Sequence, residues 1–210
     1  MSAPRPDELP LFPLGLVLLP GELLPLHIFE ERYKRLIRHC RDTGESFGIV
    51  WRQQDELAEF ACTARLRTVL REYEDGRLDV VVRGEERVRI LAAIVPEDIE
   101  FESLRAEVEI LLEEGPEPAE ELKAEVETLF REIVRLGEAA GEPELSEEYP
   151  LSYAIAHQLE MEPALKLRLL SLGGEAERLD LLVDVLRTVM ERLELLKERE
   201  DAIRGNGHAR

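Results

Sequence analysis

Residues 9–37 read LPLFPLGLVLLPGELLPLHIFEERYKRLI, and the pattern of these residues predicts the architecture of the first half of the chain. It contains two apolar runs, Leu9–Leu19 and Leu23–Phe29, each interrupted by proline. Proline excludes a helix interior because it lacks a backbone N–H and clashes with the preceding turn. It also removes a donor from a sheet, so both runs are predicted to be edge or bulged strands, separated by a turn at Pro20-Gly21.

A helix is predicted to begin at Glu30, where the spacing of the apolar residues changes. Charged residues separate apolar positions that recur at helical intervals. Glu30 and Arg32 are predicted to form an ion pair that fixes the start of this helix, and Gly44 is predicted to end it. His27 lies among apolar strand residues and is predicted to be a hydrogen-bonded core or rim residue. The apolar positions of the helix are Tyr33, Leu36, Ile37 and Cys40.

The motif L-P-L-F-P-L…L-P-G…L-P-L-x-I-F-E-x-R-Y resembles the opening of the Lon protease amino-terminal domain, the LON substrate-binding domain. The resemblance is closest to stand-alone bacterial members that lack the ATPase and protease modules. It continues in Gly48-Ile49-Val50, in Val80–Arg89 and in Leu151–Leu193, and so covers nearly the whole chain. It implies a PUA-like β pseudo-barrel and the binding of unfolded or exposed polypeptide segments.

The pattern up to residue 112 independently predicts about seven mostly antiparallel strands, forming a barrel or sandwich. Phe47–Trp51 reads as a short buried strand and Gln53–Glu59 as a loop. Glu74–Arg77 is predicted to be a hairpin turn. Gly84 is predicted to mark a bulge or corner, and Phe101–Leu112 the last strand.

Helical patterns follow the Gly115–Pro118 boundary, so the fold class is predicted to be α+β. The expected domains are a β-barrel subdomain at 1–115, an α-helical subdomain at 116–204 and a disordered tail at 205–210. The last helix, of about 24 residues from Leu179 onward, has a broad apolar face that favours packing in a bundle, with homodimeric coiled-coil pairing as the alternative. Other helices are expected over Leu122–Val134, from Pro150 or Ser152 to Leu159, and from Pro163 to the Gly173-Gly174 stop.

The formal net charge is −19, and the acidic excess lies in the middle of the chain, where residues 97–162 hold 21 acidic and 4 basic residues. This field repels nucleic acids and anionic lipid surfaces, so neither is an expected partner. Two cysteines, Cys40 and Cys62, are too few for a disulfide framework, and a cytoplasmic location is expected. No signal pattern and no apolar run of membrane-spanning length are found.

Catalytic and metal-binding motifs are absent from the sequence, so no enzyme activity and no cofactor are predicted. No glycine precedes a lysine, which excludes a G-x-x-x-x-G-K-[ST] phosphate loop. A Ser-Lys dyad needs a lysine beside the serine, and Lys166 and Ser171 do not share a helix face. The histidines show no metal-ligand spacing.

The sequence therefore predicts a non-catalytic module that binds unfolded or partly unfolded polypeptides, with a protease or chaperone as a candidate partner. The alternative is an adaptor or structural protein whose acidic helical half docks a basic partner or self-associates. Oligomeric state is left open. A binding surface needs exposed apolar side chains, and the same residues could instead belong to the core. The candidate binding residues are Leu18, Leu19, Leu23, Leu24 and Trp51.

Overall fold

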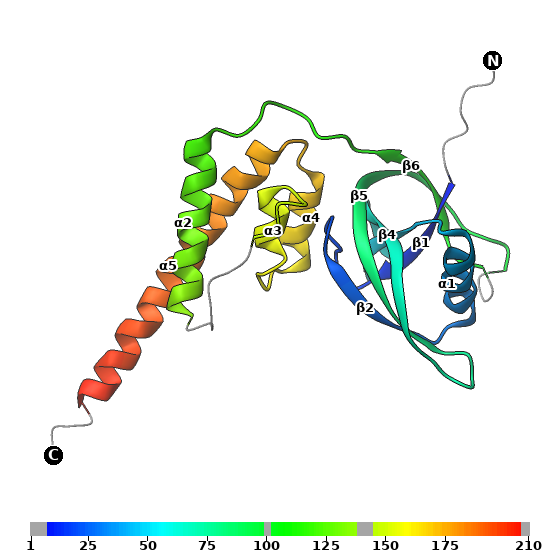
Figure 1. The fold of residues 1–210 in the computed structure, drawn as a ribbon, viewed down its shortest axis with the longest axis horizontal. Helices are drawn as coiled ribbons and strands as arrows, with labels where there is room; N and C mark the ends of the chain where they lie inside the picture. Colours follow the sequence, from blue (N-terminus) through cyan, green and yellow to red (C-terminus); the bar gives the residue numbers. More distant parts are fainter. Residues whose placement is uncertain (1–7, 99–101, 138–144, 207–210) are drawn as a thin grey trace. The chain divides into compact units, whose positions relative to one another are not determined.

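The computed structural model describes residues 8–98, 102–137 and 145–206 (Figure 1). They form two compact units. One is the chain up to Leu112 together with Ala156–Ser171, and the other is Glu113–Ile155 together with the chain from Leu172 onward. The elements in chain order are β1 (Glu8–Leu14), β2 (Leu23–Ile28), α1 (Glu31–Thr43), β3 (Phe47–Gln53), β4 (Glu56–Glu72), β5 (Leu78–Ile94), β6 (Arg105–Ile110), α2 (Glu120–Leu136), α3 (Leu151–Ala156), α4 (Pro163–Ser171) and α5 (Glu175–Asn206).

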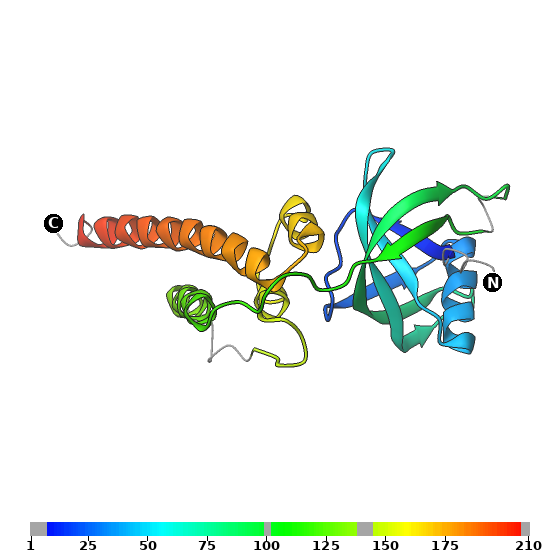
Figure 2. The ribbon, with the colours of Figure 1, turned by 90° about the horizontal axis from the view of Figure 1, so that it is seen from above.

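In the first unit, six strands among the described residues form a mixed sheet that closes on itself. Their order is β2-β5-β4-β3-β1-β6, and β6 also pairs with β5, so β1 and β3–β6 wrap into a barrel with β2 added beside β5 (Figures 1 and 2). β1 pairs in parallel with β3, and the other pairs are antiparallel. Closure leaves the barrel strands without free edges, and β2 keeps one free edge. The predicted α+β class is confirmed, with six described strands where about seven were expected.

The number of strands is lower than expected because β5 continues through Gly84, so the two segments expected on either side of this residue form one strand. Next to Gly84, Glu85 and Glu86 of β5 lie opposite the single residue Thr63 of β4, which is the predicted bulge. A Cβ atom at position 84 would lie 2.2 Å from the carbonyl oxygen of Leu19. No side chain fits at that distance, so only glycine lets the two backbones approach.

The loop predicted at Gln53–Glu59 is wrong. β3 continues to Gln53 and β4 begins at Glu56, so only Gln54 and Asp55 form the turn. Leu57 and Ala58 pack against the barrel core, and their burial extends the strand through a polar stretch. β6 is also shorter than the predicted strand, and Phe101 lies outside the described residues.

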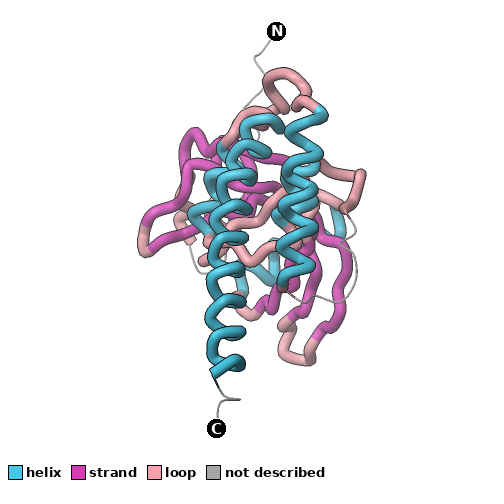
Figure 3. The backbone as a smooth tube through the Cα atoms, turned by 90° about the vertical axis from the view of Figure 1, so that its left-hand side faces the viewer, coloured by secondary structure: helices cyan, strands magenta, loops and turns pink. Residues whose placement is uncertain are grey.

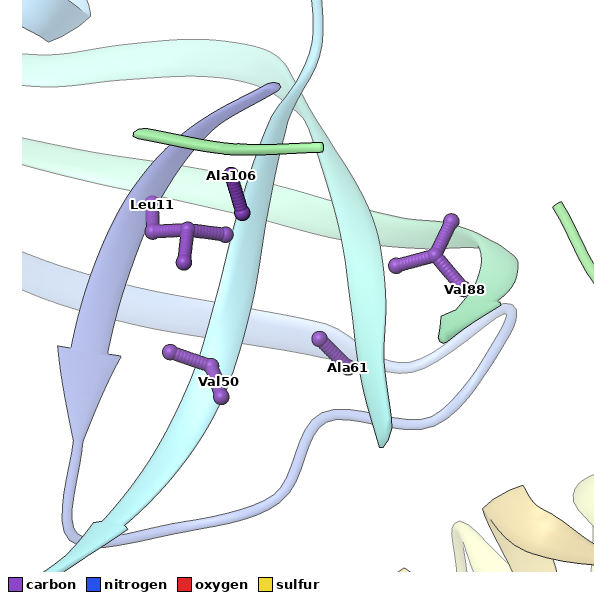
Figure 4. Packing of buried hydrophobic residues seen from close by; sticks show 5 residues of the cluster. All are labelled: Leu11, Val50, Ala61, Val88 and Ala106. Carbon is purple, nitrogen blue, oxygen red and sulfur yellow. The ribbon is translucent and has the colours of Figure 1, made fainter. Parts of the chain in front are cut away.

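The barrel interior is filled by one small or medium apolar residue from each strand of the closed part (Figure 4). None of the five exposes more than 1% of its surface. Burial of a valine or leucine side chain stabilises a fold by about 1.5–3 kcal/mol, so these residues are a main stabilising contribution of the unit. They are Leu11, Val50, Ala61, Val88 and Ala106.

Helix α1 follows the predicted pattern. Its four predicted apolar positions are all buried. The predicted ion pair is present, since Arg32 donates to the Glu30 carboxylate at 3.0 Å and 2.5 Å. Gly44 has a φ of 75° and its N–H donates to the Cys40 carbonyl at 2.9 Å, which is a left-handed helix stop.

Residues 156–171, expected in the helical subdomain, belong to the barrel unit instead. Hydrogen bonds with the Pro20-Gly21 turn and its flank hold this segment in place. His157 Nε2 contacts the Pro20 carbonyl at 2.8 Å, and Lys166 donates to Glu22 at 2.6 Å. The helical pattern of α4 does not reveal which surface its buried residues cover, so the sequence alone could not assign this segment to the barrel unit.

Acidification should weaken this attachment of residues 156–171. Burial lowers the pKa of His157 below its ordinary value near 6.5, with nearby Lys166 and Arg83 acting in the same direction and the Pro20 hydrogen bond and Glu22 opposing. Folding therefore favours the neutral ring, and its contribution is complete above about pH 6.5 and falls below it. Denaturant unfolding from about pH 7.5 to about pH 5.5 should show the wild-type advantage over His157→Gln shrinking. A constant difference across this range would contradict the assignment.

In the second unit, α2 and α5 pack side by side, and α5 extends beyond the end of α2 (Figure 3). Val126, Phe130 and Ile133 of α2 are buried, as are the first apolar positions of α5. The predicted bundle-type apolar faces are thus used within the unit. α5 has 32 residues and reaches Asn206, so it includes Gly205 and Asn206 of the predicted tail, whose remainder lies outside the described residues.

Arg178 is the polar centre of the second unit, with its side chain fully buried. Its guanidinium donates to Glu175 at 2.9 Å, to Glu113 at 2.5 Å and to the Ser152 hydroxyl at 3.0 Å. It also lies 4.8 Å from the centre of the Tyr153 ring. A buried cation requires such partners, because burial without them costs several kcal/mol.

Candidate functional site

The five residues predicted to bind a partner do not form one surface. Leu18 and Leu19 expose 1% and 0% of their surface and belong to the core, so they cannot contact a partner in the folded protein. The backbone of Leu19 is also covered by β5, which approaches it closely at Gly84. Leu23 is 59% exposed, whereas Leu24 and Trp51 are half-buried. The apolar run had left both outcomes open, because exposed and buried leucines look alike in a sequence.

None of the five lines the concave surface of the barrel unit that is here called the β1–β2 hollow, which has a volume of about 280 Å³. It lies between the end of β1, the end of β2 and the first turn of α1. Such a volume lies just below the range of about 300–1,000 Å³ for small-molecule sites, so it suits one or two side chains. Its lining residues are Phe12, Pro13, Leu14, Gly15, Leu26, His27, Ile28, Phe29, Glu30, Tyr33 and Arg52.

Two stacked aromatic rings contribute to the base of the β1–β2 hollow. Phe12 and Tyr33 stack with ring centroids 3.9 Å apart, and each exposes less than a tenth of its surface. The guanidinium of Arg32 lies 4.8 Å from the centre of the Tyr33 ring and is itself held by Glu30. Burial raises the pKa of the Tyr33 phenol, so it stays neutral around pH 7. The base is therefore rigid, aromatic and uncharged.

Phe29 gives the β1–β2 hollow an exposed aromatic rim. It follows β2 directly, at the turn into α1, and exposes 61% of its surface. Leu14 and Leu26 beside it are half-buried. A large exposed apolar side chain next to other accessible apolar residues is typical of interaction surfaces. Phe29 stands in the sequence motif F-E-x-R-Y, so the motif signalled this residue, although it was not among those predicted to bind.

The edge of β2 cannot form a continuous ladder with an added strand. Gly84 N–H donates to the Glu22 carbonyl at 3.0 Å, so the polar backbone groups of residue 22 face β5. In an antiparallel pair these groups face the same neighbour at every second residue, so those of Leu24, which pairs with Val82, also face β5. The backbone groups of residue 25 therefore face the free edge. Pro25 has no N–H there, which removes the middle donor. Binding of a partner by strand addition at this edge is therefore disfavoured relative to side-chain insertion.

A hydrogen-bonded network fixes the side of the β1–β2 hollow formed by His27. His27 Nδ1 lies 2.6 Å from the Asp79 carboxylate, which also accepts from the Tyr73 hydroxyl at 2.7 Å. The hydrogen bond with His27 lowers the pKa of Asp79 most, and the hydrogen bond from Tyr73 lowers it further. His27 is 44% exposed, so the hydrogen-bonded position predicted for it is at the rim.

Nucleophile and base pairs are not formed by the residues considered from the sequence. Lys166 is held by Glu22, and Ser171 donates to the Arg168 carbonyl. Burial raises the pKa of the Cys40 thiol to about 11, and burial also raises that of Cys62. Within the described residues, no group of three or more His, Cys, Asp or Glu side chains is placed to hold a metal ion, and no helix is long and apolar enough to cross a membrane.

A larger hollow of about 860 Å³ lies beside α1 but has a different character. Several of its charged lining residues pair with one another, as in Arg65 with Glu85 at 2.6 Å and Arg105 with Glu8 at 3.2 Å. Paired charges of both signs suit neither an apolar segment nor a ligand of one charge. The smaller β1–β2 hollow is therefore the better candidate site.

Comparison with known families agrees with the fold and the proline-containing motif. Residues 8–188 match the model of the ATP-dependent protease La (LON) substrate-binding domain. The chain belongs to the LON substrate-binding domain family. This confirms the resemblance seen in the sequence and identifies the barrel and the helices that follow as a LON domain.

Two solved structures are similar to this LON domain. The Lon N-terminal domain protein from Xanthomonas campestris superposes with a TM-score of 0.67 at 28% identity, covering 85% of this chain and 98% of that chain. The N-terminal domain of the Mycobacterium avium complex Lon protease superposes with a TM-score of 0.63 at 21% identity, covering 86% and 98%. The second likeness concerns the fold alone.

Proposed function

We propose that this LON domain binds unfolded or partly unfolded polypeptides by inserting their apolar side chains into the β1–β2 hollow. The observation that carries the proposal is the exposed Phe29 beside the stacked Phe12 and Tyr33 rings. Aromatic side chains prefer such stacked or edge-on contacts, which add about 0.5–1.5 kcal/mol to the burial of apolar surface. Folded proteins bury most of their large apolar side chains, so they offer the hollow fewer of them than an unfolded chain does.

Membership of a family named for substrate binding supports the same function, without identifying a client. The domain has no catalytic role in this proposal, and a protease or chaperone is a candidate partner. The competing adaptor function has no specific contact in its favour. In the helical unit some of the acidic residues pair with arginine or lysine, as Glu113 does with Arg178 and Glu127 with Arg131.

Replacing Phe29 with serine should weaken binding of a permanently unfolded protein roughly tenfold. The probe is fluorescently labelled α-lactalbumin with blocked cysteines, which cannot refold. Loss of one aromatic contact removes about 1.5 kcal/mol or more, and about 1.4 kcal/mol corresponds to a factor of ten. Fluorescence anisotropy measures the dissociation constant, and native α-lactalbumin should compete poorly.

The matched control is Leu70→Ser, since Leu70 is 63% exposed on β4 and does not line the β1–β2 hollow. It should bind like the wild type. Equal affinities for Phe29→Ser, Leu70→Ser and the wild type would contradict the proposal. Binding that persists in Phe29→Ser but disappears with added salt would favour the adaptor function of the acidic helical half.

A further inference from the structure

The β1–β2 hollow has a single cation at its rim without a counterion. Arg52, on β3, lines the hollow and has no ion pair within the described parts of the chain. Several arginines elsewhere in the barrel unit have ion pairs, for example Arg89 with Glu59 at 3.3 Å and Arg77 with Asp75 at 2.7 Å, whereas Arg67 and Arg71 of β4 lie outside the hollow. What distinguishes Arg52 is its place in the lining of the hollow, in a chain with a formal charge of −19.

The one carboxylate that lines the hollow does not neutralise Arg52. Glu30 receives both a 3.0 Å and a 2.5 Å hydrogen bond from Arg32, so its charge is compensated on the α1 side. Tyr33 is kept neutral by burial, and the other lining residues are uncharged apart from His27, which pairs with Asp79. Among the lining residues, Arg52 is therefore the one whose charge has no counterion and can form an ion pair with a bound ligand.

We infer that the segments bound in the β1–β2 hollow carry an aspartate or glutamate close to their apolar residue, and that Arg52 binds this carboxylate. The inference rests on the proposed function and specifies its substrate class. The planar guanidinium of arginine offers two parallel N–H donors, which match the two oxygens of a carboxylate. Because Arg52 and the apolar residues line the same small hollow, the acid lies only a few positions from the apolar side chain in the bound segment.

Three peptides test the inference, all acetylated and amidated so that no terminal charge contributes. Each has a Phe-Leu pair in a glycine–serine background, followed two residues later by glutamate, glutamine or lysine. An exposed ion pair contributes about 0.2–1 kcal/mol, so glutamate should bind up to about fivefold more tightly than glutamine, and lysine more weakly than glutamine. NMR titration measures dissociation constants into the millimolar range.

Arg52→Glu should reverse the order, so that the lysine peptide binds most tightly. Arg67→Glu is the control, since it changes the net charge equally at an exposed position of β4 outside the hollow, and it should keep the wild-type order. The wild-type preference should also shrink at high salt, where exposed charges are screened.

Equal affinity of the three peptides for the wild type would overturn the inference and leave the proposed function standing. An unchanged order in Arg52→Glu would overturn the assignment to Arg52. If no peptide binds and Phe29→Ser has no effect on the unfolded protein, the proposed function fails together with the inference.

Discussion

Replacing Arg178 with methionine should lower the free energy of unfolding by about 3–5 kcal/mol, the usual cost of removing one partner of a buried ion pair. Methionine has a similar volume but leaves the Glu175 carboxylate, only 14% exposed, without its cation. The Ser152 hydroxyl and the Leu172 carbonyl also lose a donor. Urea unfolding followed by circular dichroism measures the loss.

The double variant Arg178→Met/Glu175→Gln separates the uncompensated charge from the lost packing. It should be more stable than Arg178→Met, because glutamine removes the buried negative charge that the single variant leaves behind. A loss below about 1 kcal/mol for Arg178→Met would contradict the assignment of Arg178 as the polar centre of the helical unit.

Gly84→Ala should be the most damaging glycine substitution in the barrel unit, with a loss of about 3 kcal/mol, the upper end of the overpacking range. Its Cβ atom would lie 2.2 Å from the Leu19 carbonyl oxygen and 3.1 Å from the Cys62 sulfur. The backbone oxygen cannot move without disturbing the buried Leu18 and Leu19. Urea unfolding again gives the free energy.

Gly15→Ala is the matched control for Gly84→Ala. A Cβ atom at position 15 meets no atom within 4 Å, and its φ is not in the left-handed region. Alanine there should be neutral or raise stability by up to about 1 kcal/mol, since it restricts the unfolded chain. Similar losses in the two variants would show that β5 and the Leu19 backbone are not in close contact.

Local features of the fold could be predicted from the sequence because each has a local cause. The prolines predicted that the first two apolar runs are strands, and the helical spacing predicted which face of α1 is buried. Gly44 predicted the end of that helix, where it adopts the left-handed conformation. Gly84 marked the bulge of β5. The parallel pairing of β1 with β3 was not predicted, since strand partners far apart in the chain leave no local signal.

The candidate site was less predictable because it is assembled from separate segments. Phe12, Phe29, Tyr33 and Arg52 come from β1, the turn after β2, α1 and β3, and only folding brings them together. An apolar run shows which residues avoid water but not which of them the fold leaves exposed, so Leu18 and Leu19 were wrong candidates. No sequence pattern marks Arg52, because its importance lies in having no ion pair within the described residues, which only the structure shows.

The location of the binding site can be read directly from backbone amide NMR shifts as the glutamate-containing Phe-Leu peptide is added to the full chain. The largest changes should fall on Phe12–Gly15, Leu26–Phe29 and Tyr33, the residues of the β1–β2 hollow that insertion of an aromatic side chain would contact. Changes concentrated in α2 and α5, with the hollow unaffected, would contradict the proposed function.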